Sequence, residues 1–322
     1  MSIDKDIPSR IQSKNLKCTL ILTLIIHLLL LLDHPPAFAD EKSIGIIIAG
    51  DIKYYRDVQN IFMSKLNREG YADRVKVIVQ TPYPDDISLS NALRKLIAID
   101  VDVIVTYGAP ATVAAYNEKT KIPIVYADVY ESVASRLKAA NITGISSKLP
   151  ISSLLRYLRG IAPVKTLGIV YSSGEEDSAY QSKELYKLAG LYGLKVEPIN
   201  LQGRRNIKTV LSNRKIDAII ITHSCMASMV FSDIEDFAKT HRIPIASLMP
   251  GRNFIIALYA NPKELGEKSA ERVIKILNGM SPDRISRTCA SDTELIFNLK
   301  EAVSIGFDIP VELVTEATRL IK

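Results

Sequence analysis

The sequence is short of the residues and motifs on which disulfide-rich proteins and many enzymes depend. Its 322 residues include three cysteines, too few for a disulfide scaffold. It has no G-x-S-x-G nucleophile elbow, no H-E-x-x-H zinc motif and no P-loop. The 41 basic and 35 acidic residues leave a net charge of +6, without the basic stripe that is typical of nucleic-acid-binding proteins. We therefore expect a globular protein with no catalytic residues of these kinds and no nucleic-acid partner.

Long hydrophobic runs are also scarce, and the one that is present lies near the N-terminus. Basic residues precede an apolar run from Cys18 to Leu32, which is followed by Pro35-Pro36 and then by Ala37-Phe38-Ala39. A basic segment, an apolar segment and an A-x-A site in this order are typical of a secretory signal peptide. We therefore expect cleavage after Ala39 and a soluble periplasmic protein of residues 40–322. The alternative is a membrane anchor that is not cleaved.

Short β-branched runs alternate with longer amphipathic stretches through residues 40–322. Ile44–Ala49 is apolar at consecutive positions, as in a parallel strand buried on both faces, and a helix is predicted from Lys53 to Glu69. Strands predicted at 102–106 and 122–126 are echoed by strands at 217–222 and 243–247. Repeated β-α units predict an α/β protein with two doubly wound parallel-sheet lobes. Ligands of such sheets bind beyond the carboxyl ends of the strands, so a cleft between the lobes is expected.

Few side chains of residues 40–322 offer a nucleophile or a metal ligand. Thr222-His223-Ser224-Cys225 follows a predicted strand and therefore points toward the expected cleft. This cluster is either the polar lining of a binding site or part of a catalytic or metal site. Because no second cluster of potential metal ligands accompanies it, we favour the interpretation as polar lining of a binding site. We therefore expect no metal and no cofactor. Cys225 and Cys289 either form a disulfide or remain separate thiols.

Five stretches carry recognisable patterns in a fixed order along the chain. They are Asp102-Val-Ile-Val-Thr-Tyr-Gly-Ala-Pro-Ala-Thr112, Asn141-Ile-Thr-Gly-Ile-Ser146, Ala162-Pro-Val-Lys-Thr-Leu-Gly-Ile-Val-Tyr171, Glu264-Leu-Gly266 with Ile276-Leu-Asn-Gly279, and Asn298-Leu-Lys-Glu-Ala302 with Ile305-Gly-Phe-Asp-Ile-Pro310. Together they resemble the ABC-transporter substrate-binding proteins with the type I periplasmic-binding fold. The closer likeness is to the branch that includes tryptophan- and tyrosine-type binding proteins.

The resemblance covers residues 43–322 and implies both a domain organisation and a function. After the signal peptide of residues 1–39, lobe 1 would comprise 40–145 plus 261–286, and lobe 2 would comprise 146–260 plus 287–322, with hinge strands between them. The protein would be a monomer that closes around a small amino-acid-like ligand and delivers it to a membrane ABC permease. The alternatives are a ligand-sensing module of a membrane signalling system and an enzyme on the same scaffold.

The candidate ligand contacts of lobe 1 follow its strands. Gly50 and Asp51 come after the first strand, where they would contact ligand or cap the next helix. Tyr107, Gly108 and Ala109 precede a helix predicted to begin at Pro110, and free N–H groups there would suit a carboxylate unless the segment is a plain turn. After the next strand, an aromatic ring beside carboxylates could receive an ammonium group or could form a solvated loop; these residues are Tyr126, Asp128 and Glu131.

Lobe 2 and the crossover supply the remaining candidates. Tyr171, Ser172 and Ser173 follow one strand, and Thr222 and His223 follow another; each group lines the cleft or caps a helix. The crossover contributes Asn261, where the resembled family often has an aspartate for the ligand's ammonium, a charge that asparagine cannot supply. Glu131 falls at the aspartate of the family pattern A-x-T-D-P-V, but Ser132 replaces its proline. These departures argue against a standard α-amino acid unless Glu131 or Asp128 compensates.

Overall fold

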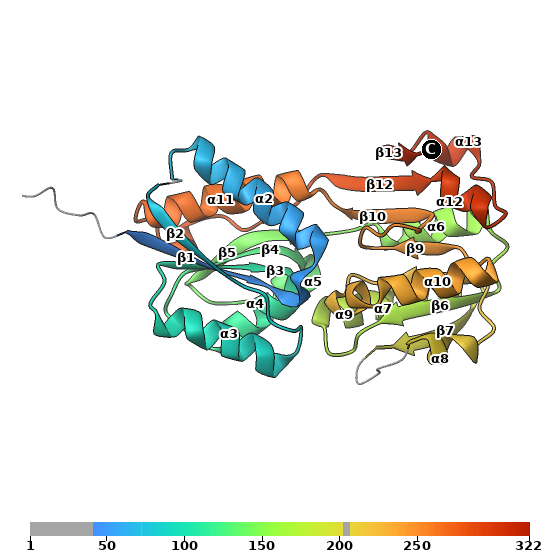
Figure 1. Cartoon of the computed structure of the whole chain (residues 1–322), viewed down its shortest axis with the longest axis horizontal. Coiled ribbons are helices and arrows are strands. Elements are labelled where there is room, and N and C mark those ends of the chain that lie inside the picture. The colour runs from blue at the N-terminus through green and yellow to red at the C-terminus, as the bar shows by residue number, and fades with distance from the viewer. Residues whose placement is uncertain (1–40, 72, 202–206) are drawn as a thin grey trace, which may run out of the picture. The chain divides into compact units, whose positions relative to one another are not determined.

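The computed structural model describes residues 41–71, 73–201 and 207–322, which form two α/β lobes (Figure 1). The strand order is β11-β5-β4-β3-β1-β2 in the first sheet and β13-β12-β10-β9-β8-β6-β7 in the second. The predicted fold class, two doubly wound lobes, is confirmed. The expected signal peptide lies outside the described residues, and no helix within those residues is long and apolar enough to cross a membrane.

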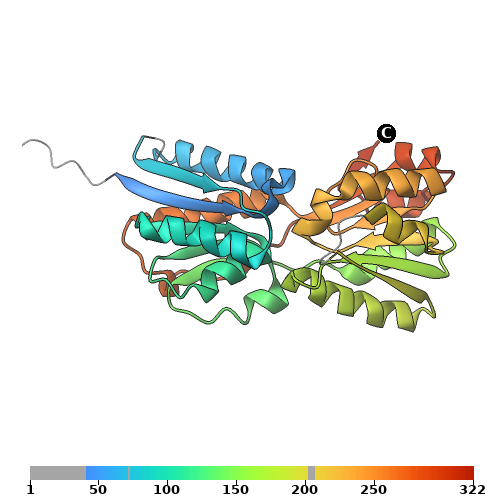
Figure 2. The same ribbon diagram turned by 60° about the horizontal axis from the view of Figure 1, so that its bottom comes forward.

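Every strand pair of the first sheet is parallel, and helices cover both of its faces, so its central strands are buried throughout. Helices α2 and α11 pack together on one face, and α3 and α4 on the other (Figure 2). The strands are β1 (Lys42–Ile48), β2 (Val75–Gln80), β3 (Val103–Tyr107), β4 (Ile124–Tyr130), β5 (Ile142–Ser147) and β11 (Thr288–Cys289). The helices are η1 (Ala49–Asp51), α2 (Lys53–Arg68), α3 (Asp86–Ala98), α4 (Gly108–Asn117), α5 (Glu131–Ala134), α11 (Pro262–Leu277) and η2 (Pro282–Arg284).

The second sheet is parallel except where β10 pairs with β12 in the antiparallel sense. β7 is an edge strand, where Pro198 is tolerated because it has no backbone N–H to donate. The strands are β6 (Thr166–Tyr171), β7 (Lys195–Asn200), β8 (Ala218–Ile221), β9 (Ile245–Ser247), β10 (Ile256–Ala260), β12 (Thr293–Asn298) and β13 (Arg319–Ile321). The helices are α6 (Ile151–Ile161), α7 (Glu176–Leu191), α8 (Ile207–Ser212), α9 (Cys225–Met229), α10 (Phe231–His241), α12 (Leu299–Ser304) and α13 (Val311–Val314).

The chain passes between the two sheets after β5, after β10 and again after β11. Near the first passage, a Cβ atom on Gly144 would lie 2.3 Å from the carbonyl oxygen of Tyr126, so β5 needs glycine there to approach β4. Thr288–Cys289 pairs with β5, so the chain passes to the second sheet for the last time at residues 290–292. Cys225 and Cys289 are both free thiols.

Candidate functional site

The two lobes meet in a hydrogen bond between buried side chains. The hydroxyl oxygen of Tyr55, in the first turns of α2, lies 2.6 Å from Nε2 of His223, which follows β8. Tyr55 is fully buried and His223 is 5% exposed. Because one partner comes from each lobe, this contact marks where the carboxyl ends of the two sheets face each other.

Asp128 lies beside this contact, at an irregularity of β4. The register between β4 and β5 shifts between Ala127 and Val129, and Asp128 has a φ of +59°, a left-handed conformation that is uncommon for residues other than glycine. Its Oδ2 is 3.3 Å from Nε2 of His223. Asp128 is 1% exposed, and neither of its carboxylate oxygens has a hydrogen-bond partner among the described residues. A buried carboxylate needs a partner, and His223 is the basic side chain recorded beside this one among the described residues.

Aromatic rings surround the contact on the side of lobe 1. The ring of Tyr55 stacks between those of Tyr107 and His223, with centroid distances of 6.1 and 5.9 Å, and Tyr54 packs against it at 5.3 Å. Burial raises the pKa of each of these three tyrosines, and the charge of Asp128 adds to the shift at Tyr54 and Tyr55. The hydroxyls are therefore neutral donors at physiological pH. The Tyr107 hydroxyl has no hydrogen-bond partner among the described residues.

Lobe 2 holds His223 in place through carboxylate and amide acceptors. The backbone N–H of His223 donates to Gln181 in α7 at 2.7 Å. Glu175 accepts hydrogen bonds from the Ser224 hydroxyl and from the backbone N–H groups of Cys225 and Met226, and so caps the N-terminus of α9. Burial raises the pKa of Glu175, although these hydrogen bonds oppose the shift. The residues after His223 are thereby fixed to α7.

Asp177, in the first turn of α7, brings a further carboxylate to the junction. Its Oδ2 accepts a hydrogen bond from the backbone N–H of Tyr130, where lobe 1 ends its fourth strand, and its Oδ1 has no partner among the described residues. Burial raises the pKa of Asp177 well above its usual range, and the charges of Asp128 and Glu175 add to the shift. The junction between the lobes is therefore rich in buried carboxyl groups, and burial favours their protonated form.

Four of the residues predicted from the sequence meet at this junction: Tyr107, Gly108, Asp128 and His223. Thr222 directly precedes His223 in the chain, and the Thr222 hydroxyl lies 2.7 Å from the Ser178 hydroxyl. α4 begins at Gly108, two residues before the predicted Pro110. Ala109 and Pro110 also line a cavity of about 350 Å³ that reaches Gly174 and Glu176 of the other lobe.

The other predicted residues are engaged elsewhere. Asp51 and Glu131 are exposed and pair with Arg56 and Lys148 at 3.5 and 3.0 Å. Asn261 caps α11 and donates to Glu294. The remaining residues lie in the lobe cores or in turns: Tyr126 is in the core of lobe 1, Tyr171 packs on that of lobe 2, Gly50 donates to Pro82, Ser172 donates to Ser178, and Ser173 exchanges hydrogen bonds with Asn200.

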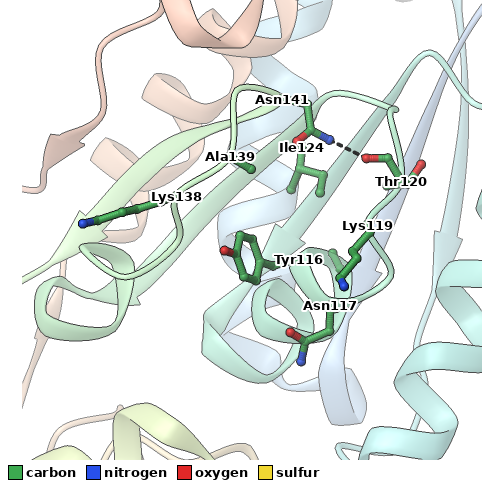
Figure 3. A pocket seen from close by; sticks show the side chains of 9 residues that line it. Tyr116, Asn117, Lys119, Thr120, Ile124, Lys138, Ala139 and Asn141 are labelled. Carbon is green, nitrogen blue, oxygen red and sulfur yellow. Dashed lines mark hydrogen bonds between the residues drawn. The ribbon is translucent and has the colours of Figure 1, made fainter.

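A second cavity, of about 280 Å³, lies at the amino ends of β4 and β5, away from the junction (Figure 3). Asn141 spans part of it and donates to the carbonyl oxygen of Thr120 at 2.8 Å. Lys119 and Lys138 are exposed at its rim. Residues 41–71, 73–201 and 207–322 contain no group of three or more His, Cys, Asp and Glu side chains that could hold a metal ion.

A family model described as ABC transporter substrate binding protein matches residues 45–321. This chain belongs to that family. Members of this substrate-binding family bind small molecules, so the junction between the lobes is the candidate ligand site. The sequence alone did not single out Tyr54, Tyr55, Glu175 or Asp177, because they look like ordinary first-turn residues of helices α2 and α7 or of the loop before α7.

Similar proteins support the assignment of this substrate-binding protein. A tyrosine-binding protein from Clostridioides difficile (strain R20291) is 25% identical over 272 residues, 80% of this chain and 79% of that protein. An ABC domain from Streptococcus pneumonia, solved with L-Trp, superposes with a TM-score of 0.80 at 22% identity over 88% of this chain and 100% of that one. The ligand-free, open structure of a Clostridium difficile substrate-binding protein with adhesive properties gives 0.62 at 24% identity over 87% and 99%. The expected type I periplasmic-binding fold is confirmed.

Proposed function

We propose that this protein binds an amino-acid-like solute between its two lobes and delivers it to an ABC permease, acting outside the cytoplasm as a monomer without catalysing a reaction. The observation that carries this proposal is the convergence of Tyr55, His223 and Asp128, which join the lobes around polar atoms without partners. Closure around a ligand would supply those partners and stabilise the form that a permease recognises.

The proposed ligand contacts divide between the lobes. From lobe 1, Asp128 would hold an ammonium group, and the rings of Tyr54 and Tyr107 would cover the apolar part of the ligand. From lobe 2, His223 and Asp177 would close over it. Because β11 pairs in the first sheet, lobe 1 would comprise residues 42–147 and 262–289. Lobe 2 would comprise residues 148–261 and 290–322. The relatives that bind L-Trp or are named for tyrosine favour an aromatic group on the ligand.

The proposal is tested by measuring the melting temperature and the heat of binding with the standard amino acids and their amines. At least one compound should stabilise the purified protein, because a ligand that binds only the native state raises its apparent stability. Asp128→Asn should weaken that binding by about one to two orders of magnitude, as loss of a buried charged partner does. Glu131→Gln, which removes an exposed carboxylate close by in the sequence, should leave the affinity unchanged. A protein that none of these compounds stabilises would contradict the transport role.

A further inference from the structure

The junction between the lobes holds buried carboxyl groups that no described lysine or arginine pairs with. Asp128 and Asp177 are 1% and 2% exposed, and three of their four carboxylate oxygens have no hydrogen-bond partner among the described residues. No described lysine or arginine forms an ion pair with either carboxylate. Basic side chains close by in the sequence are already engaged, since Arg136 pairs with Glu176 and Lys148 with Glu131.

One histidine faces these carboxylates, and it is also shared with another partner. His223 Nε2 lies 3.3 Å from Asp128 Oδ2 and 2.6 Å from the Tyr55 hydroxyl, so a single nitrogen serves both contacts. Glu175 adds a third carboxylate, which is satisfied by its hydrogen bonds to the start of α9. Leaving a charged group buried without a partner is costly, and proteins avoid it with a proton, an ion pair or a bound ion. A ligand that brings positive charge to this junction can replace such a proton and so stabilise the ionised carboxylates.

The aromatic side chains at the junction suit the same kind of ligand. The face of a tyrosine ring attracts an ammonium or guanidinium group, and the attraction grows when water is excluded. Tyr54 lies against Tyr55 at 5.3 Å and edge-on to Tyr259 at 5.6 Å and to His223 at 6.1 Å. The fully buried Tyr107 hydroxyl, which is without a partner, is an independent sign that a polar ligand atom belongs here.

The junction offers much less to a ligand's carboxylate. The sequence predicted an anion site at the start of α4, but the described lining of the cavity beside Ala109 and Pro110 includes Asp86 and Glu176 and no basic side chain. A zwitterion that paired its ammonium with Asp128 would place its own carboxylate close to the carboxyl groups of Asp177 and Glu175. A carboxylate in this position would repel their ionised forms in a buried site.

We propose that the interlobe site selects organic ammonium cations of net positive charge, held between Asp128 and Asp177 on the tyrosine faces, and that a carboxylate on the ligand weakens binding. This inference rests on the transport role proposed above and narrows its ligand class. Neutral zwitterionic amino acids become weak ligands, and amines or diamino compounds become the preferred ones.

Two matched ligand series test this by calorimetric titration of the purified protein. The first is tyramine, L-tyrosine and 3-(4-hydroxyphenyl)propionate; the second is pentylamine, 6-aminohexanoate and hexanoate, so that each series runs from an amine through a zwitterion to a carboxylate. In a series that binds, the amine should bind about tenfold or more tightly than the zwitterion. A tenfold difference in affinity corresponds to about 1.4 kcal/mol of binding free energy. The carboxylate-only compound should not bind. If a zwitterion binds and its carboxylate-free amine does not, the charge preference is overturned while the transport role stands; if nothing binds, both fall.

Asp177→Asn tests whether the preference for amines depends on the charge of this carboxyl group, because the substitution removes the charge and keeps the shape of the side chain. The variant keeps the acceptor for the Tyr130 N–H group, so it should fold, and it should lose most of the preference for the amine over the zwitterion. Glu176→Gln makes the same change of charge at the exposed neighbouring residue and should keep the preference of the unmodified protein. An unchanged preference in Asp177→Asn would overturn the role assigned to this carboxylate.

Discussion

Gly108 lies at the proposed ligand site and has an unusual backbone conformation. Its φ is +77°, in the left-handed region, and a Cβ atom there would lie 2.3 Å from the Tyr55 hydroxyl oxygen. Gly108→Ala should therefore destabilise the protein twice over, by about 1 kcal/mol or more from the strained backbone and by a further 1 to 3 kcal/mol, roughly, from overpacking against Tyr55. Urea unfolding monitored by circular dichroism measures the combined loss.

Gly70 provides the matched control, because its φ is +78° but a Cβ there would meet nothing within 4 Å. Gly70→Ala should carry only the backbone part of the loss. If the two variants lose the same free energy of unfolding, close packing between residue 108 and Tyr55 does not contribute to stability.

At the residue scale, the sequence identified side chains that directly follow buried strands. Tyr107, Asp128 and His223 were found in this way, because parallel strands end at one edge of a sheet. Tyr55 and Asp177 were missed, since each lies within the first turns of a helix and no local pattern separates such a residue from an ordinary helical one. Their role depends on the distance between the lobes, which hydrophobic periodicity does not encode.

At the scale of elements, the short helix α9 depends on a carboxylate about fifty residues away in the sequence. Glu175 receives the Ser224 hydroxyl and the N–H groups of Cys225 and Met226, and all three would lose their partner in Glu175→Ala. We expect a loss of about 1 to 3 kcal/mol or more, because buried donors would be left unpaired, together with weaker ligand binding through displacement of His223. Unfolding and calorimetric titration of the same variant measure the two effects.

Glu176→Ala is the control for this prediction. Glu176 is adjacent in the chain but exposed, and its ion pair with Arg136 is at the surface. Its removal should change the free energy of unfolding by less than about 1 kcal/mol. Equal effects of the two alanine substitutions would show that α9 forms without its remote cap.

The elements that were predicted correctly have a strong local signal. The buried runs of β1, β3 and β8 and the amphipathic helix α2 agree with the expected ranges to within a few residues. α9 was not predicted, because its five residues are too few for a periodic pattern and its cap is remote. The antiparallel pairing of β10 with β12 was not predicted either, since pairing sense depends on how the chain returns from the first lobe.

At the scale of the whole molecule, stability depends on pH because folding lowers the pKa values of some carboxyl groups and raises those of others. The exposed pair of Glu316 with Arg156 lowers the pKa of Glu316 to about 2, so its contribution is present above the unfolded pKa and is lost as pH falls through this range. Asp177 and Glu175 act in the opposite sense, because burial raises their pKa values. Their native forms hold protons that the unfolded chain has released, which stabilises the fold at low pH.

The ligand-free protein should therefore become less stable as pH rises from the unfolded carboxylate range, about 4, toward the raised pKa of Asp177. Thermal unfolding between about pH 4.5 and 8 should show a falling melting temperature in the unmodified protein and a flatter profile in Asp177→Asn. Glu316→Gln should keep the falling slope, because its pair titrates below this range. A saturating amine should restore stability at the upper end by replacing the lost proton with its own charge. If Asp177→Asn has the same slope as the unmodified protein, the proton is held elsewhere and Asp177 is not the group that a cationic ligand neutralises.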